Sequence, residues 1–465
     1  MYNTKSEQKY VMIKMVIKNP TKTYCQYCKK VLSDTKEIKL QYHKSCNEKF
    51  LEFENIHKKI AEELAPALGL PENQIVEFIN NEKLQYSLSN KGNFIELRIS
   101  DAKLDAIQLS SSELENLEKL YITNDTQIDR DGSFDPPFDN EGLINLPENI
   151  GELENLKVLD LSGNRLTMLP DSIGNLINLK ELTLDINWIK NLPESFGNLK
   201  NLETLNLKHN PIETLPDSFE NLINLKKLFL DFGNINSYNE EHRFHKLTLP
   251  ENFGNLPVLE EFRIYGAYGY GWVWIDNSIL TLPKSFSNLK KLHTLVINAK
   301  FRYETYNISN PPAFTDFNLL PENLMELDLG TNNLKEIPAE IGNFKNLEKL
   351  SLSENYLETI PSEVGNLKNL KELDLSFNQL KELPIEIGDL TNLEWACFNK
   401  NEIDSIPVTF TNLKNLKFLS FKSYSKKQIQ KIDPIIKEFF QEMKRKSGLK
   451  LSSAKSTSIP LYRII

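Results

Sequence analysis

Four residues near the N-terminus have the types and spacing of a metal site. Cys25 and Cys28 are separated by two residues, and after fourteen more residues His43 and Cys46 are again separated by two. A Cys-x-x-Cys knuckle directs two thiolates at one ion, and a His-x-x-Cys at a helix start completes a tetrahedron suited to Zn²⁺. The sequence therefore predicts one zinc ion bound by these residues. The alternative interpretation is three free thiols and a surface histidine.

The predicted zinc would be structural, because protein ligands fill all four positions and leave none for a catalytic water. In the following segment, 47–64, apolar residues recur at helical spacing from Phe50 to Ile60. A knuckle followed by a helix that carries the last ligand resembles a treble-clef zinc finger, similar to one half of a LIM domain. Ligands for one site only are present, so a RING-type ligase is not expected. Residues 1–65 are taken as this zinc module.

No other motif indicates catalysis. The sequence contains no Gly-Lys-Ser/Thr phosphate loop, no Gly-x-Gly-x-x-Gly after a predicted strand and no His-Glu-x-x-His. Asp160, Asp328 and Asp374 recur within Leu-Asp-Leu units, where a structural role is the simpler interpretation. Acidic residues crowd the segment 125–142, but they lack the regular ligand spacing of a calcium loop. We therefore expect a protein without enzymatic activity.

The elements that must position any site come from a repeat of 23 residues. In the unit that begins at Leu156, leucines occupy positions 1, 4 and 6 and Asn164 occupies position 9. Further along the unit come Pro170, Ile173 and Leu176. The other units with this pattern begin at Leu179, Leu202, Leu225, Leu324, Leu347, Leu370 and Leu393.

This pattern predicts a short strand, a turn and an outer wall in each unit. Leucines with a period of two lie on one face of a strand, and the asparagine amide can bond the backbone of the turn that follows. Pro170 cannot join a ladder, and Ile173 and Leu176 fit one turn of helix. One unit cannot bury its leucines alone, so neighbouring units must stack into a solenoid with a parallel sheet.

The 23-residue repeat resembles the LPxxIGxLxNL class of leucine-rich repeats, which includes intracellular Ras-group proteins and plant disease-resistance proteins. The resemblance implies an α/β horseshoe whose parallel sheet lines the concave side. It also implies protein partners, with small GTPases and other signalling proteins as the expected class.

The remaining chain divides around this array. Residues 66–93 are expected to form an N-terminal cap of a short helix and a hairpin about Lys91-Gly92-Asn93, whose second strand is already the first repeat. The solenoid is predicted over 94–421, with about 13 repeats and insertions near 125–142, 233–247, 265–280 and 298–319. Residues 422–465 are predicted to be a capping helix that starts at Asp433-Pro434, followed by a tail.

Three consecutive repeats break the 23-residue rule. The units that begin at Leu225, Leu259 and Leu292 are 34, 33 and 32 residues long, and each lacks the position-9 asparagine. Their extra residues are aromatic and should emerge side by side along one rim, as tyrosine and tryptophan do at protein interfaces. The alternative is that these loops merely pack on one another. The predicted partner-binding residues are Tyr238, His242, Arg263, Tyr265, Tyr268, Tyr270, Trp272, Trp274, Phe301, Tyr303 and Tyr306.

Charge and cysteine usage narrow the partners further. The net charge is −9, yet residues 1–60 carry thirteen lysines against six acids and residues 422–465 carry eleven bases against three acids. The middle is therefore strongly acidic, which argues against nucleic acid along the solenoid. No apolar run approaches the length of a membrane span. Four cysteines in 465 residues suit a reducing compartment, so we expect a cytoplasmic protein.

These observations predict a protein-binding scaffold that uses the concave sheet and the aromatic rim, with the zinc module as an accessory. The alternative function is an adaptor of a protein-modification pathway, or a sensor that holds a peptide or carbohydrate on the rim. Cys397 has no partner in the sequence and is expected to face outward with Trp395 on one strand.

Overall fold

The computed structural model describes most of the repeat array and part of each end. The described residues are 57–81, 83–89, 92–100, 107–109, 114–124, 142–231, 247–265, 282–298, 316–421, 433–447 and 450–453. The four predicted zinc ligands lie outside them, as does most of the predicted aromatic rim.

One continuous sheet runs through the described residues, with fifteen strands in chain order. The first, β1 (Leu84–Leu88), pairs antiparallel with β2 (Phe94–Ser100), and every later pairing is parallel. The hairpin and its continuation into the first repeat are as predicted. The parallel strands after β2 are β3 (Lys119–Thr123), β4 (Val158–Asp160), β5 (Glu181–Thr183), β6 (Thr204–Asn206), β7 (Lys227–Asp231), β8 (Glu261–Tyr265), β9 (Thr294–Asn298), β10 (Glu326–Asp328), β11 (Lys349–Ser351), β12 (Glu372–Asp374), β13 (Trp395–Cys397), β14 (Phe418–Phe421) and β15 (Lys450–Ser453).

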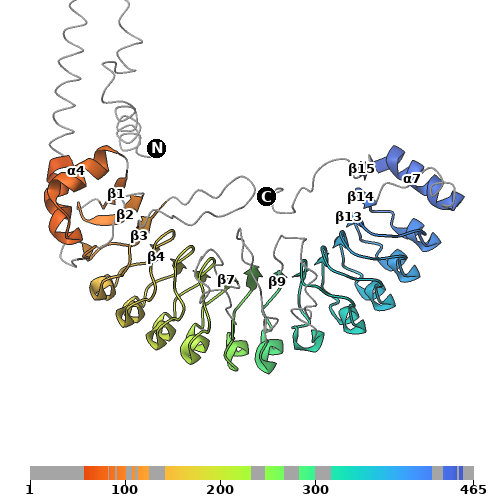
Figure 1. The fold of residues 1–465 in the computed structure, drawn as a ribbon, viewed down its shortest axis with the longest axis horizontal. Helices are drawn as coiled ribbons and strands as arrows, with labels where there is room; N and C mark the ends of the chain where they lie inside the picture. Colours follow the sequence, from red (N-terminus) through yellow and green to blue (C-terminus); the bar gives the residue numbers. More distant parts are fainter. Residues whose placement is uncertain are drawn as a thin grey trace, which may run out of the picture.

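The sheet lies on the concave side of a curved solenoid, and short helices form the convex side (Figure 1). These helices are of the 3-10 type: Ile173 N–H donates to the Pro170 carbonyl and Leu176 N–H to the Ile173 carbonyl, at 3.0 and 3.2 Å. They are η1 (Glu148–Glu152), η2 (Asp171–Asn175), η3 (Glu194–Asn198), η4 (Asp217–Asn221), η6 (Phe253–Asn255), η7 (Lys284–Asn288), η8 (Phe317–Leu319), η9 (Ala339–Asn343), η10 (Ser362–Asn366), η11 (Ile385–Asp389) and η12 (Val408–Asn412).

The core is a single apolar cluster between the two walls, as the repeat predicted. Leu159 and Leu161 are fully buried, and equivalent leucines extend this spine from coil to coil. A second feature, which the repeat pattern does not predict, is a column of phenylalanines behind the central strands. The rings of Phe196 and Phe219 stack with centroids 6.4 Å apart, and Phe253 continues the column at 6.1 Å and Phe286 at 6.0 Å.

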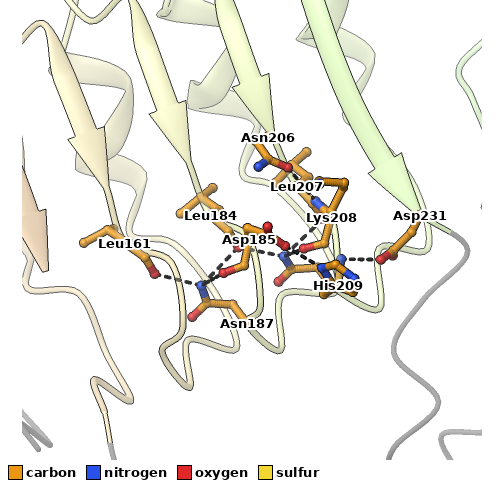
Figure 2. Close-up of polar contacts among 10 residues, drawn as sticks. Leu161, Leu184, Asp185, Asn187, Asn206, Leu207, Lys208, His209 and Asp231 are labelled. Carbon is orange, nitrogen blue, oxygen red and sulfur yellow. Dashed lines mark hydrogen bonds and ion pairs between the residues drawn. The ribbon is translucent and has the colours of Figure 1, made fainter. Parts of the chain in front are cut away.

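Asparagine at position 9 ties each regular coil to the one before it (Figure 2). Asn187 is 1% exposed and donates to the carbonyls of Leu161 and Leu184 at 2.9 and 3.0 Å. Its Oδ1 accepts the Leu166 N–H at 3.0 Å, so one side chain satisfies three backbone groups in two coils. The predicted bond to turn backbone is thus confirmed, and it also crosses between coils.

This ladder of asparagines stops at Asn210 and resumes at Asn332. Between them the position-9 residues are those of the three long repeats, none of which is asparagine. Asn332 donates to the carbonyls of Ile297 and Gly330, but its buried Oδ1 accepts no hydrogen bond from the part of the chain that the structure describes.

Helices flank the array at both ends of the described chain. Residues 57–68 are helical, so this helix continues through Pro66 and across the expected boundary at residue 65, and α4 (Glu72–Asn80) follows it. At the other end α7 (Pro434–Ser447) begins where predicted, with the Ile435 N–H bonded to the Asp433 carboxylate at 2.8 Å.

Both a helix and a strand cover the C-terminal end of the array. Ile436 of α7 is fully buried, and the Phe440 ring lies 6.2 Å from that of Phe410 in η12. The prediction of an irregular tail after this helix missed β15, which pairs with β14 and extends the sheet by one strand. In the described residues, no helix combines the length and apolarity needed to cross a membrane.

A glycine at position 19 sets how closely the 3-10 helices stack. A Cβ on Gly174 would lie 2.3 Å from the Ser195 carbonyl oxygen of the next coil, a contact that the backbone would have to relieve by moving. We expect Gly174→Ala to lower the free energy of unfolding by about 1–3 kcal/mol, since it overpacks a fixed interface. Urea melts followed by circular dichroism measure this loss.

Glu220 provides the matched control, because it occupies the same repeat position without being glycine. Its carboxylate accepts a hydrogen bond from the Asn255 amide at 2.6 Å on the exposed wall. Glu220→Ala should change stability by less than about 0.5 kcal/mol, as exposed substitutions usually do. Equal effects of the two substitutions would show that close stacking does not require the glycine.

Candidate functional site on the concave face

The middle of the concave face, from β6 to β10, contains the two predicted site residues that the structure describes. Arg263 and Tyr265 both lie on β8. Because alternate residues of a strand share a face, they project on the same side as Glu261. The other predicted site residues lie outside the described part of the chain; they are Cys25, Cys28, His43, Cys46, Tyr238, His242, Tyr268, Tyr270, Trp272, Trp274, Phe301, Tyr303 and Tyr306.

Arg263 is held in place by carboxylates from two strands. Its Nε lies 2.5 Å from Glu261 Oε1, and its Nη2 lies 3.6 Å from Glu326 Oε1 on β10. The other oxygen of Glu261 is 3.3 Å from the Lys227 ammonium on β7. Burial raises the pKa of Glu261, but the hydrogen bonds and charges of Arg263 and Lys227 together outweigh burial, so the pKa of Glu261 falls below its usual value. The result is a guanidinium with a fixed orientation and about a quarter of its side chain exposed.

Tyr265 adds an aromatic surface beside this group. The Lys208 ammonium lies 5.9 Å from the centre of its ring, within the range of a cation–π contact. Burial raises the pKa of the Tyr265 phenol, against the opposing effect of the Arg263 charge, so the hydroxyl stays protonated and can donate a hydrogen bond. Charged and aromatic groups thus lie side by side on a rigid sheet.

His209 forms a polar contact that the sequence analysis did not predict. Its Nδ1 lies 2.7 Å from Asp185 Oδ1, and its backbone N–H donates to the Asp231 carboxylate (Figure 2). Burial lowers the pKa of His209, but these two carboxylates outweigh burial and raise it overall. The backbone φ of His209 is 55°, in the left-handed region. A histidine at position 8 with an acid one coil earlier at position 7 is the only signal for this pair in the sequence.

A second polar cluster lies further along the sheet, on β10 to β14. Asp328 Oδ1 accepts the Gly330 N–H at 2.9 Å, and Asp374 Oδ1 accepts the Ser376 N–H at 2.9 Å. Burial raises the pKa of both carboxyl groups, and that of Asp374 reaches about 6. Asp328 and Asp374 were interpreted as repeat filler, and that interpretation missed the burial of Asp374.

Cys397 and Trp395 face away from the core, as expected, but Cys397 is nevertheless buried. Both lie on β13 on the concave side, but Cys397 is only 9% exposed, because its neighbours on the adjoining strands cover it. Burial and the nearby Asp374 charge raise the pKa of the thiol to about 11, so it is not a nucleophile at neutral pH. Trp395 is half-buried and stacks on Phe418, with ring centroids 5.3 Å apart and planes 8° apart.

The described part of the face has the features of a recognition surface. Its one cysteine has a thiol that stays protonated. No three histidine, cysteine or carboxylate side chains among the described residues are grouped so as to hold a metal ion. The ordered side chains described above are charged and aromatic, and arginine, tyrosine and tryptophan are enriched among the residues that contribute most to protein interfaces.

Family models match much of the array. The model described as "Leucine-rich repeat region" matches residues 171–307, "Leucine rich repeat" matches 322–380, and "Leucine Rich Repeat" matches 155–176. The search of the curated proteins returned no match.

Among solved structures, the Toll–Spätzle complex of Drosophila is 22% identical with a TM-score of 0.52, covering 74% of this chain and 41% of that one. A repeat protein of Leptospira interrogans is 28% identical with a TM-score of 0.42, covering 76% of this chain and 94% of that one. An internalin of Listeria monocytogenes is 20% identical with a TM-score of 0.45, covering 71% and 87%. The Toll match shows the fold alone.

The buried carboxyl group of Asp374 should weaken the fold at neutral pH. Its folded-state pKa of about 6 exceeds the ordinary value of 3.8, so the ionised form is disfavoured in the folded protein. This cost is absent below about pH 4, develops between pH 4 and 6, and is complete above pH 6. We expect Asp374→Asn to raise the free energy of unfolding by about 1–3 kcal/mol at pH 7.5 and to have little effect at pH 4.

Urea melts at the two pH values test this expectation. Asp160→Asn is the matched control, because Asp160 occupies the same repeat position and accepts the Ser162 N–H at 3.0 Å, yet is more exposed. A stabilisation by Asp374→Asn that persisted at pH 4, or a loss of stability at pH 7.5, would contradict the effect of burial.

Proposed function

We propose that this chain, which is a leucine-rich-repeat protein, is a non-enzymatic scaffold that binds a protein partner on the middle of its concave face. Proteins built from this repeat typically act as interaction scaffolds. The proposal adds where the partner binds and which side chains contact it.

The observation that supports it best is the fixed guanidinium of Arg263. Arginine and tyrosine are enriched among the residues that contribute most to protein interfaces. Glu261 and Glu326 already hold Arg263 in one orientation, so little side-chain entropy remains to be lost when a partner binds. A carboxylate or backbone carbonyl of the partner can take the donors that face solvent.

The strand ends support a role for the predicted aromatic rim. Asp231, Tyr265 and Asn298 end β7, β8 and β9, and they are direct neighbours across the sheet. The chain therefore leaves β7, β8 and β9 at the same end of these strands, next to Arg263. We propose that Tyr238, Tyr268, Tyr270 and their aromatic neighbours contribute to the same partner surface.

The class of partner follows from the resemblance to Ras-group repeats, which suggests a small GTPase or another signalling protein. Such a partner should be captured in one nucleotide state, GDP-bound or GTP-bound, and not in the other. If the rim instead holds a peptide or carbohydrate, that ligand should quench Trp272 and Trp274 fluorescence without any protein partner.

We propose that Cys25, Cys28, His43 and Cys46 bind one structural zinc ion. Metal analysis of the dialysed full chain should give one zinc per chain, and the double substitution Cys25→Ser and Cys28→Ser should abolish it, since two of four ligands are lost. Cys397→Ser is the control and should retain the metal. Zinc retained by the double variant would contradict this ligand set.

Reversal of charge at Arg263 tests the partner surface. With the tagged full chain as bait in an extract of the source organism, Arg263→Glu should reduce capture of the specific partners about tenfold or more. The physical reason is that a fixed donor becomes a carboxylate beside Glu261 and Glu326. Quantitative mass spectrometry of the captured proteins measures the loss.

Lys284→Glu is the matched control for this experiment. Lys284 is exposed at the start of η7 on the convex side, and its substitution changes the net charge by the same amount. A thermal melt checks that both variants fold. If both lose the same partners, or neither does, the middle of the concave face is not the binding surface.

A further inference from the structure

We propose that the part of the concave face from β10 to β14 binds a basic segment of the protein partner, with an arginine side chain held between Asp328 and Asp374 and the adjoining chain against the Trp395–Phe418 pair. This inference rests on the proposed function and names the chemistry of one partner element.

The charge of this part of the face is one-sided. Among the side chains that its strands present to the concave side, Glu326, Asp328, Glu372 and Asp374 are acidic and Lys349 is basic. Lys349 lies 3.1 Å from Glu372, and Arg263 lies 3.6 Å from Glu326. Within the described residues no cation forms an ion pair with Asp328 or Asp374. A basic segment would supply the missing charge.

The register places the two carboxylates on either side of a small residue. Asp328 on β10 is opposite Ser351 on β11, and Ser351 is opposite Asp374 on β12. Two strand spacings separate the aspartates by about 10 Å between Cα atoms. A planar guanidinium has five donors and can bond carboxylates on two sides, which a compact ammonium does less well.

The aromatic pair extends this surface toward the C-terminal end. Trp395 is directly opposite Glu372 in the sheet, one strand from Asp374, and stacks on Phe418. Both rings are half-buried and lie on the concave side. Aromatic faces accept cations and the apolar stems of basic side chains. Carboxylates beside a stacked aromatic pair therefore match a segment rich in arginine.

The charged form of Asp374 is disfavoured in the free protein. Asp374 is 8% exposed, and burial of its carboxyl group without a cation raises its pKa to about 6. An uncompensated buried charge costs stability, and a bound guanidinium would remove that cost. Groups that destabilise the free protein and are satisfied by a ligand are characteristic of binding sites.

Fluorescence anisotropy with short peptides tests the proposal on the full chain. The probe is a fluorescein-labelled peptide of four Arg-Gly units, and the matching Glu-Gly peptide is the negative control. We expect the arginine peptide alone to bind, and the double substitution Asp328→Asn and Asp374→Asn to weaken binding about tenfold or more, because charged hydrogen bonds are lost. Trp395→Ala should weaken it about threefold or more.

The control variant has the same net charge as the aspartate variant. Asp171 and Asp217 are exposed on the convex side, and Asp171→Asn with Asp217→Asn should leave peptide affinity within about twofold. The proposal is wrong if the arginine peptide does not bind the wild-type chain, if the concave variant binds as tightly as wild type, or if the convex variant loses as much affinity.

The outcome is separable from that of the proposed function. A chain that captures its partners through Arg263 but ignores the arginine peptide refutes this inference and leaves the scaffold role intact. A chain that binds the peptide through Asp328 and Asp374 but whose partner capture is unaffected by Arg263→Glu refutes the central binding surface instead.

Discussion

The fold depends on how each coil satisfies the backbone of the previous one. A short strand leaves its turn with unpaired donors and acceptors, and burial of such groups is costly. Asparagine at position 9 solves this with one side chain: Asn355, for example, donates to the carbonyls of Leu329 and Leu352 and accepts from Leu334. The leucine spine supplies the apolar burial, but the amide fixes the spacing at which the leucines meet. In the regular coils this spacing is repeated from one coil to the next.

Much of this architecture could be predicted because the repeat is redundant. Each coil repeats the same residue pattern, so a residue that departs from the pattern at one position does not alter the prediction for the array. The hairpin before the array and the helix after it were also predictable, from turn residues at Lys91-Gly92-Asn93 and a helix start at Asp433-Pro434. The phenylalanine column was missed because position 18 accepts isoleucine or phenylalanine equally well in the pattern, and only stacking distinguishes them.

The site was less predictable, because its properties arise between coils. Arg263 and Tyr265 were predicted from their place in an irregular repeat, but the carboxylate that orients Arg263 from β10 is 63 residues away in the chain. Asp160 and Asp374 occupy the same repeat position, yet only Asp374 is buried, because of its neighbours on the adjoining strands. Burial, and the pKa shift that follows from it, cannot be deduced from one repeat alone.

The gap in the asparagine ladder between Asn210 and Asn332 divides the array into two blocks. In a stack where each coil touches only its neighbours, cooperativity is transmitted across each interface in turn. In the middle, the rings of Phe219, Phe253 and Phe286 stack from coil to coil with centroids 6.1 and 6.0 Å apart. The middle coils are therefore held together by stacked rings and by the five-residue pairings of β7, β8 and β9, in place of the asparagine amides that join the regular coils.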